Sequence, residues 1–552
     1  MNSVGRFYVV SALLLIAGLS VGWRMVDLSI RKHDFLAKQG NARMRRVVDI
    51  PAHRGMITDR LGKPLAVSAQ VHAVWVNPQL VPDDAPLDKL AKLSGWDVKK
   101  LRQRIEDSES RSFIYLNRTI PPAEAEEIQK LDIPGVYTER TYKRFYPEAE
   151  VMAHVLGYTN VDDRGQEGME LAFDDWLKGV PGKKEVIKDR LGRVVADLNN
   201  IRAPREGHNL ALSIDSRIQF MAYRALASAV EEHKAKSASL VMVDVTTGEI
   251  LAMVNIPTYN PNLISGPHDG RYRNRAVTDV YEPGSTLKAF SVLSFLRSGK
   301  FKPTTVINTN PGYIVIDGHR ITDVHNCGVV TVSEAVKKSS NVAMSKMALQ
   351  INAQDMWKML LKMGFGERSS IGFPGELGGL VGVHLKWRPI EAATLAMGYG
   401  VAVTPLQLVQ GYSVIGAGGI KRQLSMVKVE KPPEGERVAS AKDVADLMQM
   451  LLGVTTGDGG TGKLAVVPGY NVAGKTGTAY IASGHGYDHT RYNSSFVGIV
   501  PVDHPRLACV VVISEPHGAH FGGPVAGPVF AKVMAGALRL LAVTPDNLPK
   551  QV

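Results

Sequence analysis

The sequence predicts a multi-domain α+β protein with one transmembrane helix at its N-terminus. Three observations support this prediction. The length of 552 residues exceeds the roughly 100–200 residues of a typical domain. Residues 7–23 form an apolar run without a charge. Beyond this run, strand-like and helix-like apolar patterns alternate along the chain.

The composition excludes several classes of protein. Hydrophobic residues make up 45% of the chain and charged residues 21%, which is typical of globular proteins and excludes a disordered or disulfide-dense chain. The net charge of +12 suits an anionic neighbour, such as nucleic acid, anionic lipid or an acidic polymer, without choosing among them. Two cysteines, Cys327 and Cys509, are too few for a disulfide framework or a cysteine-rich zinc site.

The apolar run lies between Arg6 and Arg24, and its 17 residues are at the lower limit of the length that spans a bilayer. A cleaved signal peptide is the alternative, but the sequence after the run offers no convincing cleavage site. We therefore predict an uncleaved signal-anchor. More basic residues follow the run than precede it, which by itself favours a cytoplasmic large domain, although long domains translocate despite such charges.

The rest of the chain divides near residues 203–207. Before this point, residues 49–207 mix strand patterns, such as 71–77, with helical patterns, such as 123–132, and contain no catalytic constellation. After it, the patterns predict a five-stranded antiparallel sheet flanked by terminal helices, with a helix-rich region at 280–420. The helices are expected at 216–235 and 526–542, and the strands at 239–245, 250–255, 469–480, 495–500 and 507–514.

A candidate nucleophile with its base lies at Ser285 and Lys288. Pro283 and Gly284 end an irregular segment, and the following residues have helical spacing, so Ser285 is expected at a helix N-terminus with Lys288 on the same face. An unprotonated lysine there is suited to take the serine proton. Ser-x-x-Lys also occurs at 29–32, in a basic stalk, and at 425–428, in a predicted strand at 423–430, where neither pair suits this chemistry.

Two further motifs support this site. Ser339-Ser340-Asn341 follows a helical stretch and supplies a hydroxyl for proton relay and a carboxamide for a peptide group. Lys475-Thr476-Gly477-Thr478 lies on a predicted strand, where a cation and two hydroxyls suit a carboxylate and glycine lets a substrate backbone approach. Each motif alone has a simpler explanation, a helix cap or a polar strand edge. Their combination in this order predicts an active site.

Together, Ser-x-x-Lys, Ser-x-Asn and Lys-Thr-Gly resemble the signature of penicillin-binding proteins and serine β-lactamases. Residues 54–66, 144–147, 165–170 and 189–193 are similar to the pedestal motifs of class B, transpeptidase-only penicillin-binding proteins. Residues 274–290, 398–408 and 469–479 resemble the catalytic domain of that family. The tail at 522–549 is most similar to cell-division members, known as penicillin-binding protein 3, and the elongation-specific members are the near alternative.

The resemblance implies a penicillin-recognising serine transpeptidase domain, with its five-stranded sheet and an all-helical subdomain, above a non-catalytic α+β pedestal. The expected segments are a short cytoplasmic tail with signal-anchor at 1–24, a basic stalk at 25–48, a pedestal of dimerisation type at 49–207, the transpeptidase domain at 208–545 and a tail at 546–552. It also implies a bacterial inner-membrane protein with a single span, a periplasmic catalytic domain and a place at the division site.

The implied reaction joins peptidoglycan stem peptides that end in D-Ala-D-Ala during septal wall synthesis, through an acyl-enzyme on Ser285 that β-lactams also form. The expected catalytic residues are Ser285, Lys288, Ser339 and Lys475; the substrate-binding residues are Asn341, Thr476, Gly477 and Thr478; and the backbone N–H groups of Ser285 and Thr478 form the oxyanion hole. No metal, organic cofactor or nucleic acid is expected. The implied partners are a polytopic septal glycan polymerase and other membrane proteins of the division complex.

Two other functions of this motif set remain as alternatives. A β-lactam-hydrolysing enzyme needs a base for deacylation, and no class A-type glutamate motif occurs between Ser339 and Lys475. A β-lactam-sensing receptor would need a cytoplasmic signalling domain, whereas the predicted tail has only about six residues. Residues 457–463 nearly match a phosphate-binding loop but lack the following Ser or Thr. The late histidines 485, 489, 517 and 520 lack the tight spacing of metal ligands.

Overall fold

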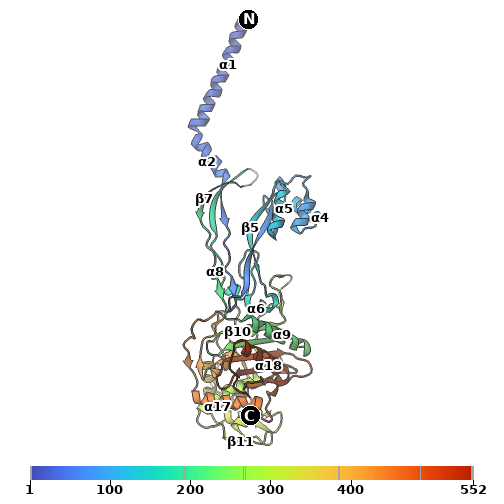
Figure 1. The fold of residues 1–552 in the computed structure, drawn as a ribbon, viewed down its shortest axis with the longest axis vertical. Coiled ribbons are helices and arrows are strands. Elements are labelled where there is room, and N and C mark those ends of the chain that lie inside the picture. The colour runs from blue at the N-terminus through green and yellow to red at the C-terminus, as the bar shows by residue number, and fades with distance from the viewer. Residues whose placement is uncertain are drawn as a thin grey trace. The chain divides into compact units, whose positions relative to one another are not determined.

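The computed structural model describes residues 3–189, 194–264, 267, 269–382, 386–484 and 486–548 (Figure 1). Most of the 189–193 motif and residues 549–552 of the predicted tail therefore lie outside the described residues. Contacts divide the chain into two compact units that interleave along the sequence. Unit 1 holds Met1–Gly55, Ser68–Lys143 and Lys178–His208, and unit 2 holds Met56–Val67, Arg144–Leu177 and Asn209–Val552.

The N-terminal helix of unit 1 has the length and composition of a membrane span. Helix α1 (Ser3–Val26) continues through a π-helical turn (Asp27–Arg31) and is followed by α2 (His33–Met44). The candidate span covers Val4–Arg31, with a mean hydropathy of 1.9 and no buried part. It is the one such helix among the described residues. The predicted apolar segment at 7–23 is thus part of a longer continuous helix.

Two β-structures make up the rest of unit 1. Strands β1 (Arg45–Ile50), β6 (Gly182–Lys188) and β7 (Val194–Arg202) form an antiparallel ribbon. Separately, the 72–76 part of β3 (Pro64–Val76) pairs with β4 (Ile114–Ile120). The buried core around this pair includes Val74, Leu90, Leu101 and Ile128. The predicted strand at 71–77 and helix at 123–132 are confirmed. The other elements are α3 (Leu87–Ser94), α4 (Val98–Glu106), α5 (Pro122–Lys130) and β5 (Val136–Phe145).

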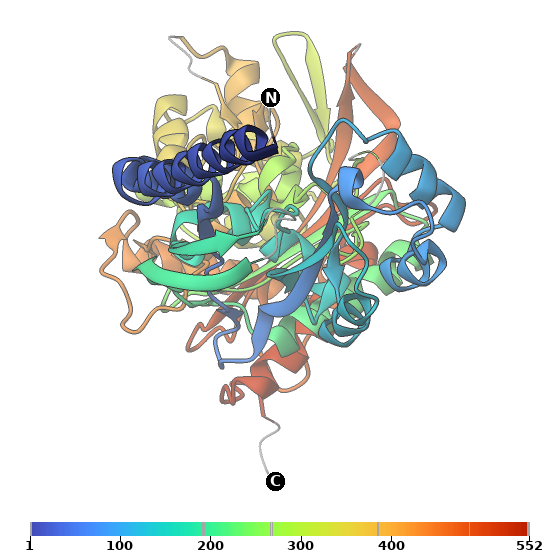
Figure 2. The ribbon, with the colours of Figure 1, turned by 90° about the horizontal axis from the view of Figure 1, so that it is seen from above.

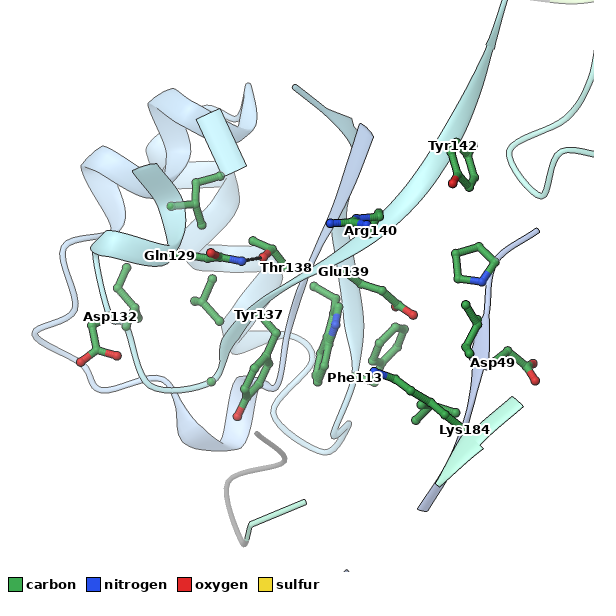
Figure 3. A pocket seen from close by; sticks show the side chains of 18 of the residues that line it. Asp49, Phe113, Gln129, Asp132, Tyr137, Thr138, Glu139, Arg140, Tyr142 and Lys184 are labelled. Carbon is green, nitrogen blue, oxygen red and sulfur yellow. Dashed lines mark hydrogen bonds between the residues drawn. The ribbon is translucent and has the colours of Figure 1, made fainter. Parts of the chain in front are cut away.

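Unit 1 also contains a cavity of about 1030 Å³ lined by aromatic side chains (Figure 3). Trp75 stacks on Tyr137 with 4.2 Å between the ring centroids and lies 4.9 Å from Phe113. Lys184 extends toward Phe113 from the β6 side, as Figure 3 shows. The region that the sequence predicts to be non-catalytic therefore contains a cavity with an aromatic lining.

Unit 2 is organised around the predicted five-stranded sheet. The strand order is β10-β9-β21-β20-β19, and every neighbouring pair is antiparallel. Helices α9 (Ser216–Glu232) and α18 (Gly522–Leu540) contact each other and the sheet (Figures 1 and 2). Helix α16 (Pro405–Gly416) packs on β9 and β21 and belongs to a different core cluster. The strands are β9 (Ser237–Asp244), β10 (Ile250–Ile256), β19 (Ala473–Ser483), β20 (Gly486–Val500) and β21 (Leu507–Ser514).

A helix-rich region completes unit 2, with short strand pairs inserted into it. The predicted strand at 423–430 is wrong. Leu424 and Met426 are buried as the alternation requires, but only isolated bridges form there, at Ser425 and Val427. The helices are α10 (Arg275–Thr278), α11 (Lys288–Arg297), α12 (Val332–Lys337), α13 (Asn341–Ala348), α14 (Ala353–Met363), α15 (Pro389–Met397) and α17 (Ala441–Thr456). The paired strands are β11 (Val306–Asn308) with β14 (Val329–Thr331), β12 (Tyr313–Ile316) with β13 (His319–Thr322), β15 (Leu380–Val381) with β16 (Val401–Ala402), and β17 (Ile420–Lys421) with β18 (Glu436–Arg437).

Segments from the first part of the chain are anchored inside unit 2 by buried polar contacts. The Asp59 carboxylate accepts from the Ser216 hydroxyl at 2.8 Å, and the Tyr259 hydroxyl donates to the Ala153 carbonyl at 3.0 Å. These contacts join Met56–Val67 and Arg144–Leu177 to the rest of unit 2. Within the second segment, Arg144 donates to Glu170 at 2.6 Å with both side chains almost fully buried. The small elements in these segments and nearby are β2 (Ile57–Thr58), α6 (Ala153–Leu156), α7 (Gly168–Ala172), α8 (Asp174–Leu177) and β8 (Leu210–Ala211).

Candidate active site

Ser285 lies on a tight turn that neighbouring segments hold in place. The residues Gly284–Leu287 form a 3₁₀ turn, and α11 begins only at Lys288, so the predicted α-helix N-terminus at Ser285 is corrected. Gly284 has a φ of +53°, which glycine adopts without strain. Its N–H donates to the Gly398 carbonyl at 3.1 Å, and the Tyr412 hydroxyl donates to the Thr286 carbonyl at 2.8 Å. The nucleophile turn is therefore set by contacts that are distant in sequence.

Ser339 occupies the corner between two helices. Helix α12 ends at Lys337, and Ser340 caps α13, because its hydroxyl accepts from the Ala343 N–H at 3.0 Å. Ser339 itself has a φ of +59°, a conformation that costs a non-glycine residue about 1–3 kcal/mol. The fold maintains this strained corner, and the Ser339 hydroxyl is directed toward Ser285 as a result.

The Lys-Thr-Gly strand passes directly beside the nucleophile turn. Strand β19 is an edge strand of the sheet. Lys475 and Gly477 are two residues apart on it, so they lie on the same face of the strand. A Cβ atom on Gly477 would clash first with the Ser495 Oγ on β20, and it would also lie 2.9 Å from the Thr286 side chain and 3.0 Å from the Pro283 carbonyl. The missing side chain is therefore what allows β19 to approach the turn so closely.

The Ser339 hydroxyl connects the three motifs. It donates to the Ser285 Oγ at 3.1 Å and accepts from the Lys475 Nζ at 3.0 Å and from the Lys288 Nζ at 3.2 Å. One donated and two accepted hydrogen bonds use the full capacity of a hydroxyl. Lys288 is therefore connected to Ser285 through Ser339. The structure thus brings together the side chains of Ser285, Lys288, Ser339, Asn341 and Lys475.

Burial changes the protonation of both lysines. Each side chain is fully buried, with 0% exposure. Loss of hydration lowers the pKa of Lys288 to about 7, against the opposing charges of Asp323 and Cys327. Burial, with the nearby charge of Lys288 in addition, holds the pKa of Lys475 well below its usual range. A neutral amine is therefore accessible near neutral pH, and a neutral amine is able to accept a proton.

Asp323 is a site residue that the sequence did not indicate. Its carboxylate accepts from the Asn341 N–H at 2.5 Å, from the Val342 N–H at 2.9 Å and from the Ser340 hydroxyl at 2.7 Å. The Asn341 side chain in turn donates to the Thr322 carbonyl at 3.0 Å and accepts from Lys288 at 2.7 Å. Asp323 is 18 residues from Asn341, so no local pattern connects the two.

The two threonine hydroxyls of the strand motif already have protein partners. The Thr476 Oγ1 lies 2.9 Å from the Thr461 Oγ1, and the Thr478 Oγ1 accepts from the Gly522 N–H at 3.0 Å. Both partners come from segments that the sequence analysis did not connect with the site. Thr461 lies in the glycine-rich loop between α17 and β19, which gives that loop a structural role beside the strand.

Two of the late histidines, His489 and His520, belong to a cluster of aromatic rings, and the His517 N–H donates to the His233 carbonyl at 2.8 Å. His489 packs against Tyr480, and His520 stacks on Tyr492 with 4.3 Å between centroids. His485 lies outside the described residues. Among the residues that the structure describes, no group of His, Cys, Asp and Glu has the arrangement of a metal site. Cys327 is half-buried, Cys509 is buried, and both are free thiols.

Comparison with known proteins identifies the family. A model described as "Penicillin binding protein transpeptidase domain" matches residues 238–535. The chain belongs to this penicillin-binding protein family. A second model, the penicillin-binding protein dimerisation domain, matches residues 49–212. The chain therefore has the two-part organisation of these penicillin-binding proteins.

Individual relatives match this chain over nearly its whole length. The chain is 42% identical over 547 residues to the "Probable peptidoglycan D,D-transpeptidase PbpC" of Pseudomonas aeruginosa, and the match covers 98% of this chain and 96% of the relative. It is 42% identical to the "Peptidoglycan D,D-transpeptidase FtsI" of Escherichia coli K12, covering 98% and 93%. Among solved structures, it resembles the transpeptidase domain of Burkholderia pseudomallei penicillin-binding protein 3, with 40% identity, a TM-score of 0.57 and coverage of 61% and 98%.

Proposed function

We propose that this chain is a peptidoglycan D,D-transpeptidase of septal wall synthesis that works through an acyl-enzyme on Ser285. The observation that carries the proposal is the Ser339 hydroxyl, which joins Ser285 to two buried amines by hydrogen bonds of 3.0–3.2 Å. Relatives at 42% identity are named peptidoglycan D,D-transpeptidases, and one is FtsI. These names support the cell-division role over the elongation-specific alternative.

The first half-reaction forms the acyl-enzyme. The Ser285 Oγ attacks the carbonyl carbon of the penultimate D-Ala while the hydroxyl hydrogen bonds reverse: Ser285 donates its proton to the Ser339 Oγ, and Ser339 donates its own proton to a neutral lysine amine. The backbone N–H groups of Ser285 and Thr478 stabilise the oxyanion, and each such donor is typically worth about 100–1,000-fold in rate. The lysine then returns the proton to the departing amine of the terminal D-Ala.

The second half-reaction transfers the acyl group. An amine of a neighbouring stem peptide attacks the ester carbonyl, loses a proton to the same relay and releases Ser285. The Asn341 carboxamide orients the substrate amide, the Thr476 and Thr478 hydroxyls bind the substrate carboxylate with help from Lys475, and Gly477 lets the substrate backbone approach. A β-lactam enters the first half-reaction and stops there, as an ester on Ser285.

The chemistry also supports a location. The substrate lies outside the cytoplasmic membrane, so α1 serves as a single-pass inner-membrane anchor with a short cytoplasmic tail, and residues 208–545 work in the periplasm at the division site. The anchor and the 49–207 pedestal are the surfaces proposed for contact with a polytopic septal glycan polymerase and other division proteins, and residues 25–48 form the basic stalk between them. Residues 546–552 form a terminal tail.

Labelling of the detergent-solubilised full chain tests the reaction. Fluorescent penicillin is expected to label the wild type stably, and Ser285→Ala is expected to take no label. Turnover of a D-Ala-D-Ala thioester mimic with an added amine acceptor then separates a transpeptidase from a receptor, and rapid loss of the label would instead show a β-lactam-hydrolysing enzyme. A Ser285→Ala protein that still took the label would defeat the proposal.

Cell shape after depletion tests the septal role. Filamentous cells are expected if the protein builds the septum. Spherical cells would identify the elongation-specific alternative. A catalytically dead Ser285→Ala copy, expressed at the same level, is the control that ties the shape change to transpeptidation.

A further inference from the structure

The large cavity of unit 1 has no part in the proposed reaction. The residues that line it all belong to unit 1, whereas the hydrogen-bonded groups around Ser285 belong to unit 2. Its volume of about 1030 Å³ reaches the upper end of the range of about 300–1,000 Å³ that sites for small organic ligands typically occupy. The cavity therefore has room for a ligand made of several rings.

Aromatic rings form one wall of this cavity (Figure 3). Val74 and Ile114 belong to the buried core of unit 1. Trp75 and Phe113, the residues next to them in the chain, therefore project from the opposite face of the strands. Tyr137 on β5 stacks on Trp75 with 4.2 Å between the ring centroids. Trp75 and Tyr137 are half-buried and Phe113 is 43% exposed, so the rings are accessible to a ligand in the cavity.

Polar side chains reach the same space from two sides. Figure 3 shows Glu139 extending into it from β5 and Lys184 from β6. Glu139 is exposed and makes no side-chain hydrogen bond or ion pair with the described residues, so its carboxylate is free to accept. Lys184 donates to Asp197 at 3.0 and 3.1 Å, which uses two of the three donors of its ammonium group. A ligand between them meets a free acceptor and a fixed donor.

The lining as a whole is nearly balanced in charge, although the chain carries +12. A polyanion would need a positive surface, and the core of a protein interface is depleted in Asp, Glu and Lys, so neither class of partner matches this lining. A sugar does match it, because its C–H groups stack on aromatic faces while its hydroxyls donate to carboxylates and accept from amines. The charged lining residues are Asp49, Asp132, Glu139, Arg140 and Lys184.

We propose that this cavity is a glycan site, in which sugar rings of a peptidoglycan strand stack on Trp75 and Phe113 and donate hydrogen bonds to Glu139. The choice of peptidoglycan rests on the proposed function, because such a transpeptidase acts on stem peptides that are attached to glycan strands. Unit 1 then binds a part of the polymer that does not react, while the stem peptides react at Ser285 in unit 2. Binding of this remote part holds the substrate at the enzyme.

The test uses full-length protein in lipid nanodiscs after complete acylation with benzylpenicillin, so that Ser285 is occupied. Nanodiscs are chosen because the sugar head groups of maltoside detergents would compete for the cavity. Saturation-transfer NMR titrations measure binding of the tetramer of β-1,4-linked N-acetylglucosamine, which is a glycan without peptides. A separate titration uses the tripeptide L-Ala-γ-D-Glu-meso-diaminopimelate, which is a stem peptide without sugars. The tetrasaccharide is expected to bind and the tripeptide is not.

Two variants of the cavity and one matched control locate the binding. Phe113→Ala removes an exposed ring and is expected to weaken binding of the tetrasaccharide about tenfold. Glu139→Gln keeps the size of the side chain but removes its charge, and is also expected to weaken binding about tenfold. It serves as the test where Phe113→Ala does not fold, because Glu139 is exposed. Phe220→Ala is the control, since Phe220 is 44% exposed but lies on α9 in unit 2, and it is expected to bind as the wild type does.

The outcomes are distinguishable. Binding of the tetrasaccharide that Phe113→Ala or Glu139→Gln weakens, and that Phe220→Ala leaves unchanged, supports the proposal. The proposal is overturned if the tetrasaccharide does not bind, if both cavity variants bind it as the wild type does, or if Phe220→Ala weakens binding equally. Binding of the tripeptide alone also overturns it and identifies a peptide ligand. Failure of the wild type to be acylated by benzylpenicillin would count against the proposed function instead.

Discussion

Removal of the Ser339 hydroxyl is the perturbation that isolates the proton relay. In Ser339→Ala the Cβ remains, so the corner with its φ of +59° gains no new strain. The change removes the hydrogen bond of 3.1 Å to Ser285 and the two bonds from Lys288 and Lys475. Lys288 keeps its bonds of 2.7 Å to the Ser339 carbonyl and to Asn341, so it stays in place.

The magnitude follows from the loss of one proton-transfer path. Proton transfer by a positioned group typically contributes about 100–10,000-fold. Because Lys288 is connected to Ser285 only through Ser339 among its described hydrogen bonds, we expect the acylation rate to fall about 1,000-fold. This corresponds to about 4 kcal/mol of transition-state stabilisation. The second-order rate of acylation by fluorescent penicillin, measured in stopped flow, gives this quantity directly.

Ser340→Ala is the matched control for this experiment. The Ser340 hydroxyl caps α13 and donates to Asp323 at 2.7 Å, but it makes no hydrogen bond to Ser285. Its loss is expected to cost about 1 kcal/mol of stability with a much smaller change in acylation. If Ser339→Ala acylates within threefold of the wild type, or if Ser340→Ala loses as much as Ser339→Ala, the relay argument is wrong.

Four further predictions follow from the same contacts. Acylation is expected to decline as the pH falls through about 7, because protonation of Lys288 removes the acceptor amine, and a flat pH–rate profile between pH 6 and 8 would contradict this. Gly477→Ala places a Cβ against Thr286 and Pro283, so labelling by fluorescent penicillin should fall at least about tenfold. Circular dichroism is expected to show a folded protein. Normal labelling would show that β19 is free to move away from the turn. Asp323→Ala leaves the Asn341 N–H and the Val342 N–H without their acceptor, so the acylation rate should fall about tenfold. The acid limb of the pH–rate profile should also move to lower pH, because the Asp323 charge raises the pKa of Lys288 in the wild type. An unchanged acid limb would refute this effect of Asp323 on the pKa of Lys288. Arg144→Ala breaks the 2.6 Å ion pair and leaves the Glu170 carboxylate buried without it, so the free energy of unfolding, measured by chemical denaturation, should fall by about 3–5 kcal/mol. Arg271→Ala removes an exposed ion pair and is the control, which should change the free energy of unfolding little.

The predictable parts of this protein are those in which local pattern and tertiary structure agree. Strands β9, β10, β19, β20 and β21 follow from apolar runs with turn signals between them, and the order of the three motifs indicates the catalytic residues. The 423–430 segment shows the limit of this reasoning. It alternates in burial as a strand does, but it meets two different neighbours through single bridges, Ser425 with Glu249 and Val427 with Leu212, so a continuous ladder does not form.

The interleaving of the two units had no local signal. Residues 56–67 and 144–177 look like part of the first region, yet they belong to unit 2 through contacts such as Asp59 with Ser216 and Ala153 with Tyr259. Both contacts join residues that are more than 100 positions apart in the sequence. A pattern of apolar residues reports which face is buried, but it does not report which distant segment covers it.

By itself, the sequence determined the chemical groups of this site: a serine hydroxyl, two amines and a carboxamide, with the helices and strand that carry them. Only the tertiary structure decided how those groups act. Burial at 0% exposure lowers the pKa of Lys288 and of Lys475, and the Ser339 corner connects both amines to Ser285. Desolvation and hydrogen-bond geometry depend on segments that meet only in the folded chain, as Asp323 and Asn341 do across 18 residues.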